Sequence, residues 1–297
     1  MEKSIYMIRL AAAAVIASAM TACAVVKVPK VEDLQVFGHF HSRNDTTLTT
    51  PVYIAADLKE RSIQSVSLDR KRGLLRTLTN QHDRMKVFDF SGNLLTEVHK
   101  PHTGHNNDMC YVDDKLWVVG TKKITEPQLW LYDIPTNTAV RQDVMAVRNW
   151  GRDRDLSGVC DYDDNTLLLV ARENMKSTRG ANQPGDMMGI YKMDKSTGQI
   201  SQWFELPWRG IFVQGITYVN GYLFVATNML YKIHGGMSIW VIDTRSQELV
   251  DEMIIYFDGE AEGLDYNFEK GKLWLYVGLG SPAGKFAYVG KFKSMYQ

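Results

Sequence analysis

A unit that recurs five times along the chain constrains the fold more than any other feature of the sequence. Each copy starts with a polar, a small and an apolar residue and usually has an aromatic residue at its fifth position. A short polar turn and an apolar run follow, and the second positions of successive copies are 43, 50, 57 and 48 residues apart. Such a period is typical of repeat architectures, in which each unit buries its apolar face against the next. The copies start at Gln64, Asn107, Ser157, Gln214 and Glu262.

A second pattern follows each of the first four copies in phase. Apolar residues lead to an aspartate and then to a turn, and the aspartates are Asp89, Asp133, Asp194 and Asp243. The apolar runs are short, rich in β-branched and aromatic residues, and bounded by turn residues, which favours strands over helices. Four-stranded antiparallel blades repeated radially form a β-propeller. The sequence therefore predicts an all-β chain with a single propeller domain at residues 31–297.

Closure of the ring requires a strand from the start of the chain. The chain ends at Gln297, soon after the third run of the last copy, so that blade lacks its fourth strand. An N-terminal strand that completes it leaves no open sheet edge. We assign this role to residues 34–40 and favour five blades. Residues 52–55 form another apolar run, so a degenerate sixth blade is the alternative.

The first residues resemble a bacterial export signal. Lys3 and Arg9 precede an apolar run at residues 10–20 that is too short to span a bilayer. The following Met-Thr-Ala-Cys at 20–23 resembles the lipobox of bacterial lipoproteins, which implies a signal peptide at 1–22, acylation of Cys23 and a tether at 23–30. The absence of Asp after Cys23 then favours the outer membrane of a Gram-negative cell envelope. An ordinary signal peptide with an incidental cysteine is the alternative.

The charge balance gives no reason to expect a nucleic acid as partner. Lys and Arg together number 34, as do Asp and Glu, so the formal net charge is zero. The expected partners are the membrane, through the lipid anchor, and a glycan, a peptide or an envelope protein. The sequence contains no G-x-S-x-G elbow and no phosphate-binding loop.

Loop lengths distinguish the two faces of the predicted propeller. Tight hairpins such as Asn220-Gly221 join first to second and third to fourth strands, and we expect no room for a site on that face. The connections on the opposite face are long, and binding residues gather on long loops of a rigid scaffold. There, Arg172 is expected to orient hydrogen bonds and Trp208 to offer a stacking surface. The candidate ligand-binding residues are His105, Asn107, Asp108, Ser157, Arg172, Trp208, Gln214, Asn228 and Glu262.

The polar starts of the five copies are predicted to meet at the long-loop mouth of the central channel. Buried polar groups need partners there, such as one another, water, a metal or a ligand. Glu262 is the most informative of them, because an inward carboxylate is costly without a partner. Glu262, Asp108 and Asn107 offer oxygen ligands for a divalent cation such as Ca²⁺. His102, His105 and Asp108 are an alternative set for a transition metal.

Two cysteines occupy the same position in neighbouring copies. We expect Cys110 and Cys160 to be buried free thiols. A disulfide between them is the alternative, since the predicted compartment is oxidising.

Two segments of the repeat resemble the gluconolactonase and strictosidine-synthase-like propellers. They are residues 215–218 (Gly-Ile-Thr-Tyr) with Asn220-Gly221, and residues 262–266 (Glu-Gly-Leu-Asp-Tyr). The resemblance implies one divalent cation over the channel, held by Glu262, Asn107 and Asp108. This chain departs from the family in that Glu262 lies in the last blade, whereas those enzymes place a ligand glutamate in the first.

Three functions follow as hypotheses from these features. The first is a lipid-anchored binding module whose long-loop face takes a glycan, peptide or partner protein. The second is a metal-dependent hydrolase of the lactonase or esterase type, in which the ion polarises a carbonyl and activates water. The third is a structural subunit of an envelope assembly.

Overall fold

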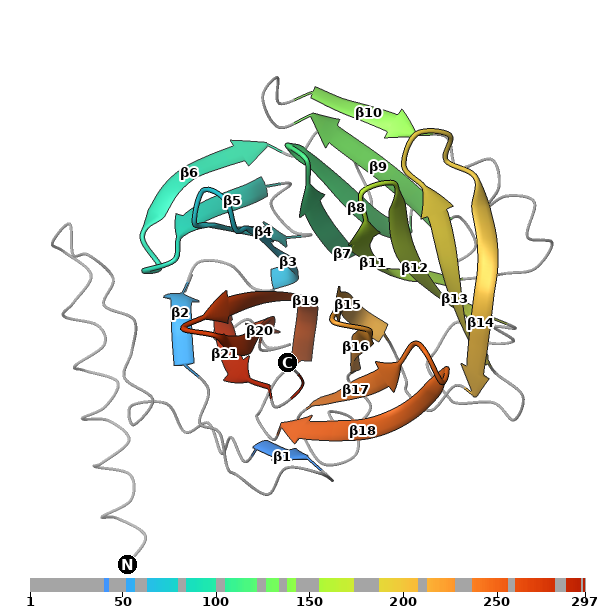
Figure 1. Cartoon of the computed structure of the whole chain (residues 1–297). Helices are drawn as coiled ribbons and strands as arrows, with labels where there is room; N and C mark the ends of the chain where they lie inside the picture. The colour runs from blue at the N-terminus through green and yellow to red at the C-terminus, as the bar shows by residue number, and fades with distance from the viewer. Residues whose placement is uncertain are drawn as a thin grey trace, which may run out of the picture.

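Five antiparallel sheets stand around a common axis in the computed structural model (Figure 1). The structure describes residues 40–42, 52–56, 63–79, 84–99, 105–121, 127–133, 138–142, 155–173, 187–207, 213–227, 237–255, 260–280, 287–294 and 296. Within these ranges, no helix is long and apolar enough to cross a membrane. The all-β fold and the five-bladed β-propeller predicted from the repeat are confirmed.

Three blades are built from consecutive strands, numbered outward from the axis. Blade I contains β3 (Ile63–Asp69), β4 (Leu74–Thr79), β5 (Arg84–Asp89) and β6 (Leu94–His99). Blade II contains β7 (His105–Val112), β8 (Lys115–Thr121), β9 (Pro127–Asp133) and β10 (Thr138–Gln142). Blade III contains β11 (Asp155–Asp163), β12 (Thr166–Glu173), β13 (Met187–Asp194) and β14 (Ile200–Pro207).

The other two blades each include a strand from the N-terminal part of the chain. Blade IV contains β15 (Val213–Val219), β16 (Tyr222–Thr227), β17 (Met237–Asp243) and β18 (Glu248–Ile255), with β1 (Phe40–Ser42) added outside β18. Blade V contains β19 (Glu260–Glu269), β20 (Lys272–Gly280) and β21 (Ala287–Lys293), and β2 (Val52–Ala56) is its outer strand.

The closing strand differs from the predicted one. The run at 52–55, considered above for a sixth blade, forms β2 and completes blade V, where Val52 pairs with Lys291. Of the predicted segment 34–40, only Phe40 is among the described residues, and it pairs with Ile255 of blade IV. The physical reason is chain length, because β2 precedes the first blade by only residues 57–62 and reaches the neighbouring edge of β21 with the shorter connection.

The aspartates of the second sequence pattern each end the third strand of a blade. Asp89 Oδ1 accepts hydrogen bonds from the backbone amides of Ser91 and Asn93, both at 2.9 Å. Asp194 Oδ1 accepts from the amides of Ser196 and Thr197 in the same way. A carboxylate that replaces a turn carbonyl stabilises a tight turn, which explains why this residue type recurs there.

The hydrophobic core lies between the blades. Five clusters of buried side chains occupy the five interfaces between adjacent blades. Val66 packs with Tyr276 between blades I and V, for example, and Phe224 with Phe292 between blades IV and V. A blade alone cannot bury these surfaces, so the ring forms as a unit around its axis.

Candidate functional site in the central channel

The innermost strand of every blade carries a β-bulge at the first or second position of the repeat. In blades I to IV, pairing with the second strand skips the polar start of the repeat, which is Gln64, Asn107, Ser157 or Gln214. In blade V it skips Gly263, the residue after Glu262. A bulge changes the direction of the bulged side chain. The innermost strands contact their neighbours around the ring (Figure 1). Because the five polar residues all lie near the start of an innermost strand, they share one level at the long-loop end of the channel.

Three of these polar side chains form hydrogen bonds across a blade interface. Gln64 Nε2 donates to Glu262 Oε1 at 3.2 Å, between blades I and V. Asn107 Nδ2 donates to the carbonyl oxygen of Leu156 at 2.7 Å, between blades II and III. Gln214 differs, because its side chain is partly exposed and has no hydrogen-bond partner in the described part of the chain.

Asp108 occupies the axis one residue further along β7. Its Oδ2 accepts hydrogen bonds from the backbone amides of Val159, at 3.1 Å, and Ile216, at 2.9 Å. One carboxyl group therefore links blades II, III and IV. Asp108 is fully buried, and its Oδ1 has no hydrogen-bond partner in the described ranges. Burial raises the pKa of Asp108 well above its usual value, although the backbone hydrogen bonds act in the opposite direction.

Asp108 stands at the second position of the repeat, and blades III to V have glycine there. These glycines allow the innermost strands to lie close together. A Cβ atom on Gly215 would lie 2.5 Å from the backbone carbon of Gly263, and one on Gly263 would lie 2.3 Å from the amide nitrogen of Val66. A Cβ on Gly158 would lie 2.8 Å from Ile216 Cγ2. The channel is therefore narrow at this level, and Asp108 separates its two ends.

The three residues predicted to hold a divalent cation are engaged in bonds between the blades. Asp108 Oδ2 and Asn107 Nδ2 form bonds that join blades II, III and IV, and Glu262 Oε1 accepts from Gln64 Nε2. Burial raises the pKa of Glu262 well above its usual value, with Glu260 adding to the shift and Gln64 opposing it. Among the residues that the structure describes, no group of three His, Cys, Asp or Glu side chains could hold a metal ion.

The remaining predicted residues are placed only in part. His105 begins β7 and Arg172 lies near the end of β12, so both backbones are at the long-loop end. Ser157 is buried in β11. The predicted residues Cys23, His102, Trp208 and Asn228 lie outside the described residues.

Cys110 and Cys160 are buried free thiols, as predicted. Burial raises the pKa of both thiols well above the usual value, so both stay protonated near neutral pH. Neither has the character of a catalytic nucleophile.

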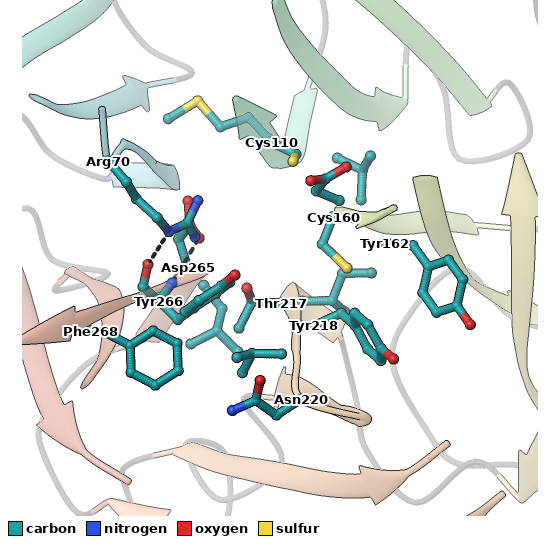
Figure 2. A pocket seen from close by; sticks show the side chains of 16 residues that line it. Arg70, Cys110, Cys160, Tyr162, Thr217, Tyr218, Asn220, Asp265, Tyr266 and Phe268 are labelled. Carbon is teal, nitrogen blue, oxygen red and sulfur yellow. Dashed lines mark hydrogen bonds and ion pairs between the residues drawn. The ribbon is translucent and has the colours of Figure 1, made fainter. Parts of the chain in front are cut away.

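A cavity of about 220 Å³ lies at the other end of the channel, on the face of the tight hairpins (Figure 2). Every blade contributes to its wall, including Arg70, Cys110, Cys160, Thr217 and Asp265. The expectation that this face has no room for a site is therefore wrong. The turns are tight, but the cavity lies between the innermost strands, and the turns contribute Arg70 and Asn220 to its wall.

An ion pair forms one side of this cavity. Arg70 pairs with the carboxylate of Asp265, and its Nε donates to the carbonyl oxygen of Tyr266 at 2.7 Å. The guanidinium carbon of Arg70 also lies 4.0 Å from the centroid of the Tyr266 ring. Asp265 Oδ2 accepts from the Ser67 hydroxyl at 3.1 Å and the Leu68 amide at 2.7 Å, so this side is firmly held.

Aromatic rings form much of the rest of the wall. Tyr162 and Tyr218 have ring centroids 4.8 Å apart, and Tyr266 and Phe268 have centroids 5.9 Å apart. Burial raises the pKa of Tyr218 and of Tyr266, so both phenols keep their protons at neutral pH. Tyr218 and Tyr266 stand at the fifth position of their copies of the repeat, which was the sequence signal for them, whereas Tyr162 and Phe268 lie outside that position.

No protein-family model and no curated protein matches the sequence. Among solved structures, the chain is similar to a luciferin-regenerating enzyme, with 12% identity and a TM-score of 0.48 over 83% of this chain and 96% of that one. It is similar to a gluconolactonase from Xanthomonas campestris, with 10% identity and a TM-score of 0.49 over 82% of this chain and 89% of that one. It is also similar to regucalcin, a calcium-binding protein from Agrobacterium tumefaciens, with 11% identity and a TM-score of 0.48 over 82% and 96%.

The strand pairing and the channel define the class of this protein. It is a five-bladed β-propeller whose channel is divided by a buried aspartate into a polar long-loop mouth and a cavity on the hairpin face. Since one fold hosts many functions, the function depends on the side chains at the two ends of this channel.

Proposed function

We propose that the protein is a lipid-anchored binding module of the cell envelope, with its ligand site at the long-loop mouth of the channel. The observation that supports this most directly is Gln214. The bulges of the innermost strands of blades I to IV each present a polar side chain at this mouth, and Gln214 is partly exposed there without a hydrogen-bond partner among the described residues. Polar groups of this kind orient a ligand in a preformed site.

The ligand is a glycan, a peptide or an envelope protein, and the site is tested by affinity. A binder is first found on glycan and peptide arrays, and its affinity is then measured with Gln214→Ala. Loss of one hydrogen bond should weaken binding about threefold to tenfold. The control is Gln202→Ala, since Gln202 is an exposed glutamine on the outer strand of blade III.

Trp208→Ala should also weaken binding, because Trp208 is proposed to stack on the ligand. Unchanged affinity in both Gln214→Ala and Trp208→Ala would remove the long-loop mouth as the site.

The anchor is tested by fractionation. The Met-Thr-Ala-Cys segment supports acylation at Cys23, and outer-membrane localisation is proposed from the residue that follows it. We expect the wild-type protein in the outer-membrane fraction and Cys23→Ala in the soluble fraction. Cys110→Ala is the control, because Cys110 is buried inside the propeller. Membrane retention of Cys23→Ala would contradict the anchor.

A hydrolase of the lactonase or esterase type is the second candidate, and the burial of Glu262 favours it. A buried carboxyl that keeps its proton at the mouth of a channel can act as a general acid toward a leaving oxygen. The metal-dependent form of this hypothesis is tested by the divalent-metal content of protein purified without chelator. Hydrolysis of lactones or aryl esters that is lost in Glu262→Gln would support the enzyme. An inactive wild-type protein without stoichiometric metal would dismiss it.

A further inference from the structure

We propose that the cavity on the hairpin face is a second binding site, which takes one neutral sugar ring. It lies at the opposite end of the channel from the long-loop mouth, with Asp108 and the glycine level between them. It is therefore independent of the function proposed above. Figure 2 shows the cavity with Arg70 and Asp265 on one side and aromatic rings around it.

The size of the cavity limits the ligand to about one ring. Pockets for drug-sized ligands start at about 300 Å³, and this cavity holds about 220 Å³. Most of its wall consists of strand residues from all five blades, with Arg70 and Asn220 added from hairpin turns, and strand residues hold their positions better than residues on loops. A small, rigid cavity of this kind selects a small, rigid ligand.

The charges of the wall are already paired. Asp265 forms an ion pair with Arg70, and Asp161 lies 2.8 Å from Lys195 Nζ. A ligand that brings its own charge would find no free opposite charge among these groups and would lose its hydration. The cavity therefore favours a neutral ligand over an anion or a cation.

The rest of the wall suits a ring with apolar faces and polar edges. Tyr266 and Phe268 lie on one side in the view of Figure 2, and Tyr162 and Tyr218 on the other, with Thr217 between the two pairs. The aromatic faces can pack against the C–H faces of a sugar ring, while the Tyr266 phenol and the Thr217 hydroxyl bond to its hydroxyl groups. The Tyr218 phenol is already hydrogen-bonded to Thr244 and Tyr162, so Tyr218 offers its ring face. Phe268 is 44% exposed, so part of this surface is open to a ligand from outside.

The test is binding of single sugars to the purified full chain, measured by calorimetry and by ligand-observed NMR. The probes are D-glucose, D-galactose, D-mannose and N-acetyl-D-glucosamine, with D-glucuronate and D-glucosamine as charged analogues of the same ring. We expect at least one neutral sugar to bind with a Kd of about 1 mM or below, and its charged analogue to bind at least about tenfold more weakly.

Two variants assign the binding to this cavity. Phe268→Ala should weaken it about threefold to tenfold, and the control Leu95→Ala should leave it unchanged, since Leu95 is an exposed apolar residue on β6, away from the cavity. Gln214→Ala should also leave it unchanged, so this proposal and the proposed long-loop site can fail separately. The proposal is overturned if no neutral sugar binds below about 10 mM, if a charged analogue binds equally well, or if Phe268→Ala has no effect.

Discussion

At the scale of single residues, Asp108 is the most consequential side chain of the channel. Propellers usually need contacts only between adjacent blades, but Asp108 also reaches Ile216, two blades away. Its burial is complete, and its neutral form resembles an amide in shape and hydrogen bonding. The residue therefore acts as a fixed cross-link at the axis.

Two substitutions of Asp108 distinguish its role as a hydrogen-bond acceptor between blades from a role of its negative charge. Asp108→Ala leaves the amides of Val159 and Ile216 without acceptor, and we expect the free energy of unfolding to fall by about 2–5 kcal/mol. Asp108→Asn keeps an acceptor oxygen, so its loss should be clearly smaller. Urea unfolding of both variants provides the measurement, and equal losses would argue against the cross-link.

Glu262 should make stability depend on pH. In the folded protein it keeps its proton at pH values above 4.5, where an ordinary glutamate has lost it, so the unfolded state binds fewer protons and stability falls as the pH rises. We expect Glu262→Gln to flatten this fall between about pH 5 and pH 8. The exposed Glu248→Gln is the control for urea unfolding across that range. An identical slope in Glu262→Gln and wild type would contradict the raised pKa.

At the scale of elements, the innermost strands depend on the small residue at the second position of the repeat. The five strands approach one another at this level, and glycine in three of them removes the side chains that would keep them apart. The adjacent bulge then turns the preceding polar side chain. The small residue and the bulge together produce a narrow central channel with polar side chains at its long-loop end.

Two alanine substitutions test this close approach. Gly215→Ala places a methyl group against backbone atoms, and we expect little folded protein. Gly158→Ala meets only the side chain of Ile216, which can shift, so its free energy of unfolding should fall by about 1–3 kcal/mol. Soluble yield and urea unfolding are the measurements. Equal stability of the two variants would show that β15 and β19 can separate without loss.

The strands could be predicted from sequence more fully than the site. The repeat phase predicted the innermost strands and the common level of their polar starts, because small and polar residues recur there for steric reasons. It did not predict the bulges, which depend on the pairing with the second strand. The closing strand was misassigned, since residues 34–40 and 52–55 both read as strands and only the edge of β21 selects between them. The cavity was missed because spacing along the chain does not show which side chains line the inside of a ring. Arg70 and Asp265, which pair across blades I and V, are 195 residues apart.

At the scale of the whole molecule, stability resides in the interfaces between blades and in the closure of the ring. The five interblade clusters leave no blade with a core of its own. β2 covers the outer edge of β21 and so supplies the fourth strand of blade V. Without β2, the last blade has three strands and an exposed edge.

Two shortened chains test the importance of this closure. Removal of residues 1–51 deletes β1, which contributes only three residues to blade IV, and we expect a Tm close to that of the wild type. Removal of residues 1–57 also deletes β2, and we expect the Tm to fall by at least about 10 °C or the protein to aggregate. Thermal unfolding by circular dichroism distinguishes the two. Equal Tm values would mean that β2 contributes little to the ring.

The pairing of β2 with β21 also sets the order of events during biogenesis. Val52 is synthesised long before Lys291, yet the two are partners in the same sheet. The ring cannot close until β21 has emerged from the ribosome, and contacts so distant in sequence form slowly. Before β21 is synthesised, β2 has no strand to pair with. A nascent chain that stops before β21 would leave β2 available to aggregate or to bind a chaperone.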